Sequence, residues 1–167
     1  MNINVIQTEI HQNAKEHGWW EGARESLEIM GLVVGEASEL NEALRDEQGA
    51  DVQCDKPVHL TCREEETADI FIRVCDYSEY IGMSNEDYTK SINMVAVKSM
   101  MSKMSEGAQV GYIIKRITSA FDIKFSFKPI LAVCEVYADI HGFNLDKAVT
   151  LKHLYNKTRP YKHGKQF

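Results

Sequence analysis

The chain has 167 residues, enough for one good hydrophobic core, and its 44% apolar and 26% charged residues are those of an ordinary soluble globular protein. Its formal net charge of −6 argues against a general nucleic acid binder, because such proteins need a basic surface to displace counterions from phosphates. The stretch MNINVIQTEIHQ lacks a signal-peptide pattern and no apolar run is long enough to span a bilayer, so a cytoplasmic protein without a membrane segment is expected.

Helical patterns dominate the sequence. Only three prolines occur, good helix formers are abundant and alternating strand patterns are nearly absent, so the predicted fold class is all-α. Gly18 is expected to stop the first helix, and Thr61 with Glu64 provides a capping box for the third. The predicted helices cover about 3–17, 22–46, 62–81, 85–105, 108–121, 129–140 and 145–157.

No stretch rich in glycine, serine or proline divides the chain, so a single domain over residues 1–167 is expected. The piece FDIKFSFKP at 121–129 could hold a brief strand. The methionine-rich face of the predicted 85–105 helix is interpreted as adaptable core or as a subunit contact. The four cysteines form no CxxC pair and no regular framework, which favours reduced thiols.

Two pairs of acidic residues stand where stripes suited to burial would continue. On the second helix, Glu36 and Glu39 are three residues apart and in line with the apolar Leu32. On the third helix, Glu66 and Asp69 have the same spacing. Antiparallel packing of the two helices, which a 15-residue loop permits, would bring the four carboxylates together. Alternatively, both pairs could lie on solvated helix faces, where such spacings are common.

Four converging carboxylates would need a counter-cation. Two unpaired carboxylates about 4 Å apart repel by roughly 4 kcal/mol at an effective dielectric near 20, so four in one crevice cannot all stay ionised unaided. Hard divalent ions with oxygen ligands meet this need. The expected cofactor is therefore Mg²⁺, with Mn²⁺ as the alternative.

The order of these acids resembles a known family pattern. Glu36-Ala-Ser-Glu39, followed after 26 residues by Glu66-Thr-Ala-Asp69, is similar to the paired ExxE and ExxD motifs of the all-α nucleoside triphosphate pyrophosphohydrolases. This MazG-like superfamily also includes dimeric dUTPases and phosphoribosyl-ATP pyrophosphohydrolases. The early HGWW and the C-terminal LKHLYNKTRPYKHGKQF resemble further segments of the family, so that the resemblance covers about residues 10–82 and 130–167.

The resemblance implies a MazG-like four-helix core bundle with a helical insertion at about residues 84–128, a segment that compact members of the family lack. It also implies self-association as a homodimer or homotetramer, because MazG-like folds commonly build their core and pocket between subunits. The expected partner is a nucleotide substrate, with no nucleic acid polymer and no membrane.

The activity implied by the resemblance is hydrolysis of a nucleoside triphosphate, NTP or dNTP, to the monophosphate and pyrophosphate. Glu36, Glu39, Glu66 and Asp69 would be the catalytic acids and the metal ligands. Mg²⁺ bound by them would bridge phosphate oxygens and lower the pKa of a water molecule for attack at the α-phosphorus. Glu39 is the expected general base.

Substrate-binding residues are also implied by the resemblance. Lys152 and Arg159 would neutralise phosphate charge, and Asn156 would hydrogen-bond the sugar or a phosphate. Trp19 or Trp20 would stack on the base. The alternative for either tryptophan is a hydrophobic anchor between the first two helices.

Two further basic residues have candidate roles. Lys165, in the closing segment His163-Gly164-Lys165, is expected to contact the substrate. Arg73 would either reach a phosphate or form an internal ion pair with Asp69 or Asp76. A different functional class also stays open, in which the chain is a non-catalytic helical module that senses nucleotide or binds a partner.

Overall fold

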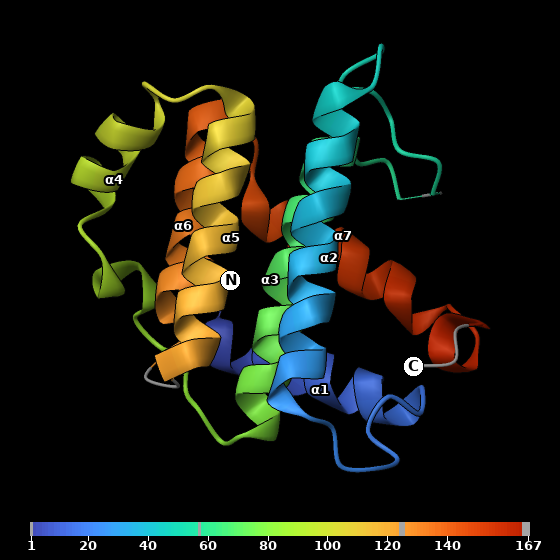
Figure 1. Cartoon of the computed structure of the whole chain (residues 1–167). Coiled ribbons are helices and arrows are strands. Elements are labelled where there is room, and N and C mark those ends of the chain that lie inside the picture. Colours follow the sequence, from blue (N-terminus) through green and yellow to red (C-terminus); the bar gives the residue numbers. More distant parts are fainter. Residues whose placement is uncertain (1, 57, 124–125, 165–167) are drawn as a thin grey trace.

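The computed structural model describes residues 2–56, 58–123 and 126–164. Within these ranges the elements of regular secondary structure are helices joined by turns and loops (Figure 1). The predicted all-α class is therefore confirmed. In chain order the elements are α1 (Ile3–Glu16), α2 (Ser26–Arg45), α3 (Cys62–Tyr80), the 3₁₀ helix η1 (Tyr88–Ser91), α4 (Met94–Met101), α5 (Glu106–Ile123), α6 (Lys128–His141), α7 (Leu145–Lys157) and the 3₁₀ helix η2 (Tyr161–Gly164).

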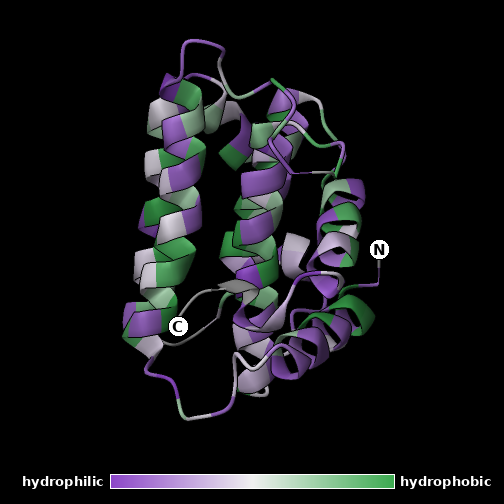
Figure 2. Cartoon of the chain, turned by 90° about the vertical axis from the view of Figure 1, so that its right-hand side faces the viewer, coloured by the Kyte–Doolittle hydropathy of each residue, from purple (hydrophilic) through white to green (hydrophobic). Residues whose placement is uncertain are grey.

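Helix α3 is the central element of the fold. It packs against α1, α2, α6 and α7, while α5 packs against both α2 and α6 (Figure 1). Phe71, Val74 and Cys75 on α3 belong to the core and are at most 1% exposed. Each long helix carries both hydrophobic and hydrophilic residues along its length (Figure 2), as expected for helices that bury one face. Because α3 is enclosed by its neighbours, the acids on this helix are drawn out of water.

Local signals in the sequence set several helix ends as predicted. The side chain of Thr61 accepts from the backbone N–H of Glu64 at 3.2 Å, and the Glu64 carboxylate accepts from the N–H of Thr61 at 2.9 Å, which completes the capping box of α3. Asn144 caps α7 by accepting from the N–H of Lys147 at 2.8 Å. Gly18, with a φ of +80°, lies in the turn that follows the end of α1. The capping box sets the residue at which α3 begins, and α3 carries half of the predicted acids.

The predicted helix over 85–105 is wrong as a single element. The structure has η1 and the short α4 within this range. Asp87 adopts a left-handed φ of +56°, which no continuous helix tolerates. Asn93 then caps a new helix by accepting from the N–H of Ala96 at 3.0 Å. The apolar periodicity of this segment was real, but these two local interruptions override it.

The segment predicted as an insertion, at about 84–128, contributes to the core. Its longest helix, α5, packs against α2 and α6, and Ile113 and Ile117 on it are fully buried. The division of the chain into a family core and an insertion stays a prediction. The possible strand at 121–129 falls partly on residues 124 and 125, which lie outside the described residues. In the ranges that the structure describes, no helix is both long and apolar enough to cross a bilayer.

Candidate metal centre

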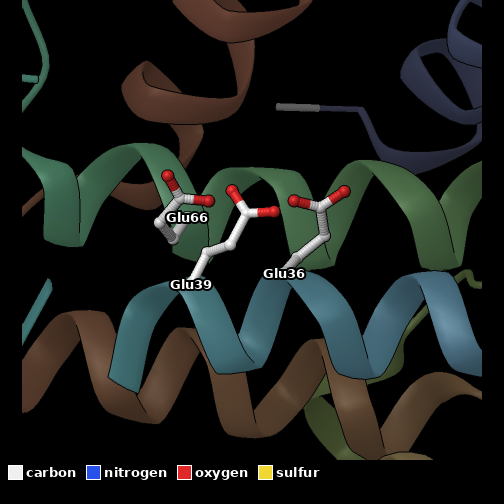
Figure 3. Close-up of side chains that lie close together, drawn as sticks. All are labelled: Glu36, Glu39 and Glu66. Carbon is white, nitrogen blue, oxygen red and sulfur yellow. The ribbon is translucent and has the colours of Figure 1, made fainter. Parts of the chain in front are cut away.

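Three of the four predicted acids meet in the space between α2 and α3. Glu36 and Glu39 extend from α2 toward α3, from which Glu66 reaches back to them (Figure 3). One carboxylate oxygen of each residue lies within 4.8 Å of those of the other two. The spacing of three residues on α2 places both glutamates on the side that faces α3. The expected convergence of these three acids is therefore confirmed.

The three carboxylates differ in their access to water. Glu36 and Glu66 are buried, at 9% and 8% exposure, whereas Glu39 is exposed. The Oε2 atom of Glu66 has no hydrogen-bond partner within the described part of the chain. Burial, together with repulsion from Asp69, raises the pKa of Glu66 to about 8. Without a cation the cluster thus holds one carboxyl group that resists ionisation at neutral pH.

Asp69, the fourth predicted acid, lies outside this group of three. Its Oδ2 atom is 2.7 Å from Nζ of Lys152, which comes from α7. Burial raises the pKa of Asp69 to about 6, against the attraction of Lys152. Asp69 nevertheless lines the same cavity as Glu36 and Glu39. Its role as a metal ligand stays a prediction.

Lys152 is buried in an ion-pair network. It is 1% exposed and pairs with Glu65 as well as with Asp69. Glu65 is itself 1% exposed and also pairs with Lys56, from the loop between α2 and α3. Burial acts to raise the pKa of Glu65, but hydrogen bonds to Cys54, Lys152 and Lys56, together with attraction from Lys152, hold the pKa below its ordinary value. The predicted phosphate contact of Lys152 is untested, and in this structure the residue joins α7 to α3.

A cavity of about 270 Å³ adjoins the acids. Seven of the residues predicted from the sequence line it, namely Trp19, Glu36, Glu39, Asp69, Arg73, Asn156 and Arg159. They come from the α1–α2 turn, from α2 and α3, and from the end of α7 and the segment after it. The segment around Trp19 and the segment from Asn156 to Arg159, which are far apart in sequence, thus line the same cavity. Lys165 lies outside the described residues.

The two tryptophans have different surroundings. Trp19 lines the cavity, and Cζ of Arg73 lies 5.7 Å from the centre of its ring. Trp20 donates through Nε1 to Asp76 at 2.9 Å and stacks on Tyr80 with ring centres 4.1 Å apart. Trp20 is therefore a structural anchor between the α1–α2 turn and α3. Trp19 is 8% exposed, and its role as a base-stacking residue stays a prediction.

Two polar residues of the cavity lining, Arg73 and Asn156, differ in their partners. Arg73 forms an internal ion pair, as one alternative expected, but its partner is Glu36, with 2.9 Å between Nε and Oε1. Asn156 is 8% exposed, and its Oδ1 atom has no hydrogen-bond partner in the ranges that the structure describes. The cavity thus joins a carboxylate cluster to an arginine, an unpaired amide oxygen and an aromatic ring.

Lys56 is the functional candidate that the sequence did not reveal. It lines this cavity and also a neighbouring one of about 430 Å³ beside Glu65 and Glu66. Attraction from Glu65 raises the pKa of Lys56 although burial opposes this. A lysine in an irregular loop carries no periodic signal, so only the path of the loop back toward α3 could identify it.

Comparison of the chain with protein-family models, with curated proteins and with solved structures found no match. The resemblance to MazG-like proteins therefore rests on the spacing of the acids and on the two flanking segments. The geometry of the site is independent of that resemblance. It consists of three converging carboxylates, a cavity with an aromatic wall, and cationic side chains at the edges of the cavity.

Proposed function

We propose that this chain is a metal-dependent nucleotide pyrophosphohydrolase of the MazG-like type, which hydrolyses a nucleoside triphosphate to the monophosphate and pyrophosphate. The observation that carries the proposal is the convergence of Glu36, Glu39 and Glu66 beside the cavity that Trp19 and Arg159 line. A metal site alone would not indicate nucleotides. The aromatic ring and the cationic groups in the same cavity provide for a base and for phosphates.

The donor set fits a hard divalent cation, Mg²⁺ or Mn²⁺. All three groups offer carboxylate oxygens, the ligands that these ions prefer. Oε2 of Glu66 lacks a hydrogen-bond partner among the described residues, and burial with repulsion from Asp69 raises the pKa of this residue, so a cation beside it would favour the ionised carboxylate. When bound, such an ion polarises a phosphate and makes a water molecule more acidic.

The protein's own groups divide the remaining work. Glu39, the exposed member of the cluster, accepts the proton of the attacking water. Arg73 holds the Glu36 carboxylate in place through their ion pair. Trp19 stacks on the base, and Arg159 neutralises phosphate charge.

The test is a panel of NTPs and dNTPs, with Mg²⁺ and with EDTA, in which pyrophosphate is resolved from single-phosphate release. Metal-dependent release of pyrophosphate is expected for at least one nucleotide. Glu39→Gln should lower turnover at least tenfold with an unchanged helical circular dichroism spectrum. Glu86→Gln, which changes the same charge at an exposed position that lines neither cavity beside the acids, is the matched control. No turnover with any nucleotide would refute the proposal.

A second candidate is a non-catalytic module that binds nucleotide as a sensor. Two internal ion pairs favour it, because Arg73 neutralises Glu36 and Lys152 neutralises Asp69 without any metal. Such a protein would bind nucleotides in the same panel, detected by calorimetry, and would release no pyrophosphate. Calorimetric titration with Mg²⁺ alone separates both candidates from a purely structural acidic bundle, for which no specific site is expected.

We also propose, from the family resemblance, that the chain forms a homodimer or homotetramer. Large apolar side chains such as Leu27 and Val95 are exposed, at 64% and 80%, and are available for contacts between copies. Light scattering coupled to size exclusion measures the mass in solution. A monomer at micromolar concentration would contradict self-association and leave the proposed chemistry unaffected.

A further inference from the structure

We propose that Lys56 binds the terminal phosphates of the nucleotide and, after hydrolysis, the pyrophosphate product. This inference rests on the proposed function and names a residue that the family motifs do not include. Lys56 lies in the loop between α2 and α3 and lines both cavities beside the acidic cluster.

Trp19 and Lys56 lie near opposite ends of the site, because they contact residues on different turns of α3. Trp19 lies next to Arg73, and Lys56 pairs with Glu65. Arg73 and Glu65 are eight residues apart on one helix, which corresponds to about 12 Å at 1.5 Å per residue. Glu66 lies close to the Lys56 end. An extended nucleotide with its base on Trp19 would therefore pass the acids and present its last phosphates to Lys56.

The other cations are not placed for this task. The backbone of Arg159 lies at the Trp19 end, because its carbonyl oxygen lies 2.9 Å from Nε2 of His17 in the α1–α2 turn, and Cζ of its guanidinium group lies 5.9 Å from the centre of the Tyr155 ring on α7. Lys152 is not among the described residues that line the cavity, and its ammonium group is occupied by two carboxylates. Lys56, in contrast, is 34% exposed, and within the part of the chain that the structure describes its ion-pair partner is Glu65.

The shared carboxylate makes Lys56 free to exchange partners. Glu65 is 1% exposed and pairs with both Lys56 and Lys152. If Lys56 turns to a phosphate, the buried Glu65 carboxylate keeps Lys152 as its counter-ion. The exchange therefore leaves the buried Glu65 carboxylate with an ammonium partner, which Glu65 then shares with Asp69, whereas a buried carboxylate without any cation would oppose the exchange strongly. Lys56 is therefore a partly exposed cation beside the cluster that can leave Glu65 to bind a phosphate.

The experiment is calorimetric titration of the full chain, in the presence of Mg²⁺, with pyrophosphate and separately with a nucleoside monophosphate. Lys56→Gln is expected to weaken pyrophosphate binding at least tenfold and to change monophosphate binding less than twofold. Lys98→Gln is the matched control, because Lys98 is a partly exposed lysine, away from both cavities, that pairs with Asp139 at 2.6 Å. This control should bind both ligands as the unmodified chain does.

Lys56→Arg keeps the charge and should restore pyrophosphate binding to within a few-fold of the unmodified chain, which excludes a loss through misfolding. Unchanged pyrophosphate binding by Lys56→Gln, an equal loss of both ligands, or no binding of pyrophosphate by the unmodified chain would each overturn the inference. The nucleotide panel tests the proposed function separately. Turnover with unchanged pyrophosphate binding by Lys56→Gln refutes only the role of Lys56, whereas selective pyrophosphate binding without turnover refutes only the hydrolase.

Discussion

The ammonium group of Lys152 lies 2.7 Å from Oδ2 of Asp69, so the acid that completes the ExxD pattern already has a cation as its partner. Glu65 provides a second carboxylate to the same lysine. Lys152 and Glu65 are each 1% exposed, and the side chain of Asp69 is 14% exposed. This buried network fastens α7 to α3 and positions Asn156, one turn farther along α7, at the cavity.

The first prediction follows from this burial. Lys152→Met should lower the free energy of unfolding by about 3–5 kcal/mol, because removing one member of a buried ion pair leaves a charge without compensation. Urea denaturation, monitored by circular dichroism, measures the change. Lys157→Met is the control, since Lys157 is 44% exposed and lies 3.9 Å from Glu9, and exposed pairs contribute at most about 1 kcal/mol.

The stability result also separates two roles of Lys152. If its main role were to bind phosphate, Lys152→Met would raise KM for the nucleotide and leave the unfolding midpoint close to that of the Lys157→Met variant. A large loss of stability is expected instead. An unfolding free energy within 1 kcal/mol of the unmodified chain would contradict the structural role.

The second prediction concerns pH. Burial and repulsion from Asp69 raise the pKa of Glu66 to about 8 in the folded chain, against an ordinary value of 4.5. The folded state therefore binds one more proton than the unfolded state between these values. Under linkage, the free energy of unfolding of the metal-free protein falls as pH rises from about 4.5 to 8. Glu66→Gln cannot ionise and should lose this part of the pH dependence.

Thermal unfolding in EDTA between pH 6.5 and 8 isolates Glu66 from Asp69, because the pKa of Asp69 is raised only to about 6. Added Mg²⁺ should stabilise the unmodified chain more at pH 8 than at pH 6.5, since the ion binds the ionised carboxylate. Glu66→Gln should respond weakly at both values. Parallel pH profiles for the two proteins in EDTA would show that Glu66 does not titrate in this range.

Local sequence signals predicted the helices and most of the acidic cluster, for identifiable physical reasons. The capping box of Thr61 and Glu64 fixes where α3 begins, and the spacing of three residues then aims Glu66 at α2. On α2, the same spacing aims Glu36 and Glu39 at α3. These relationships depend on neighbours in sequence, and a helical period is enough to obtain them.

The partners of the cations could not be predicted in the same way. Lys152 pairs with Asp69, which is 83 positions earlier in the sequence. The side of α7 that faces α3 depends on how the whole chain packs. Lys56 reaches the site through a loop without periodicity. The prediction of one helix over 85–105 is wrong for a local reason. The backbone of Asp87 is left-handed and interrupts a segment whose composition favours helix.

The third prediction tests the contact between the two chain segments at the mouth of the cavity. A Cβ atom at Gly18 would overlap the ring of Tyr161, and the φ of Gly18 is +80°. Gly18→Ala should therefore displace the segment after α7, which includes Arg159, in addition to backbone strain of about 1–2 kcal/mol. Nucleotide affinity should fall several-fold, and limited proteolysis should cut this segment faster.

Gly22→Ala is the matched control for this substitution, because a Cβ atom there meets nothing within 4 Å. It should change neither affinity nor proteolysis. If Gly18→Ala destabilises the fold but leaves nucleotide affinity unchanged, the contact with Tyr161 does not position Arg159.

The fourth prediction separates the two tryptophans. The chain has only these two, so each substitution leaves a single fluorescent reporter. Trp19 lines the cavity, whereas Trp20 is held by Asp76 and Tyr80. Nucleotide should quench the fluorescence of Trp20→Phe, which retains Trp19, and should leave that of Trp19→Phe nearly unchanged.

Substitution of Trp19 should change nucleotide affinity, whereas substitution of Trp20 should change the free energy of unfolding. Trp19→Ala is expected to weaken nucleotide binding about tenfold or more, since stacking of a base on an aromatic ring is worth about 1–3 kcal/mol. Trp20→Phe should instead lower the free energy of unfolding by about 1–3 kcal/mol, because Asp76 loses a buried hydrogen-bond donor. Quenching that persists in Trp19→Phe would place the base against Trp20 or elsewhere, and the direction assigned to the nucleotide along α3 would then be wrong.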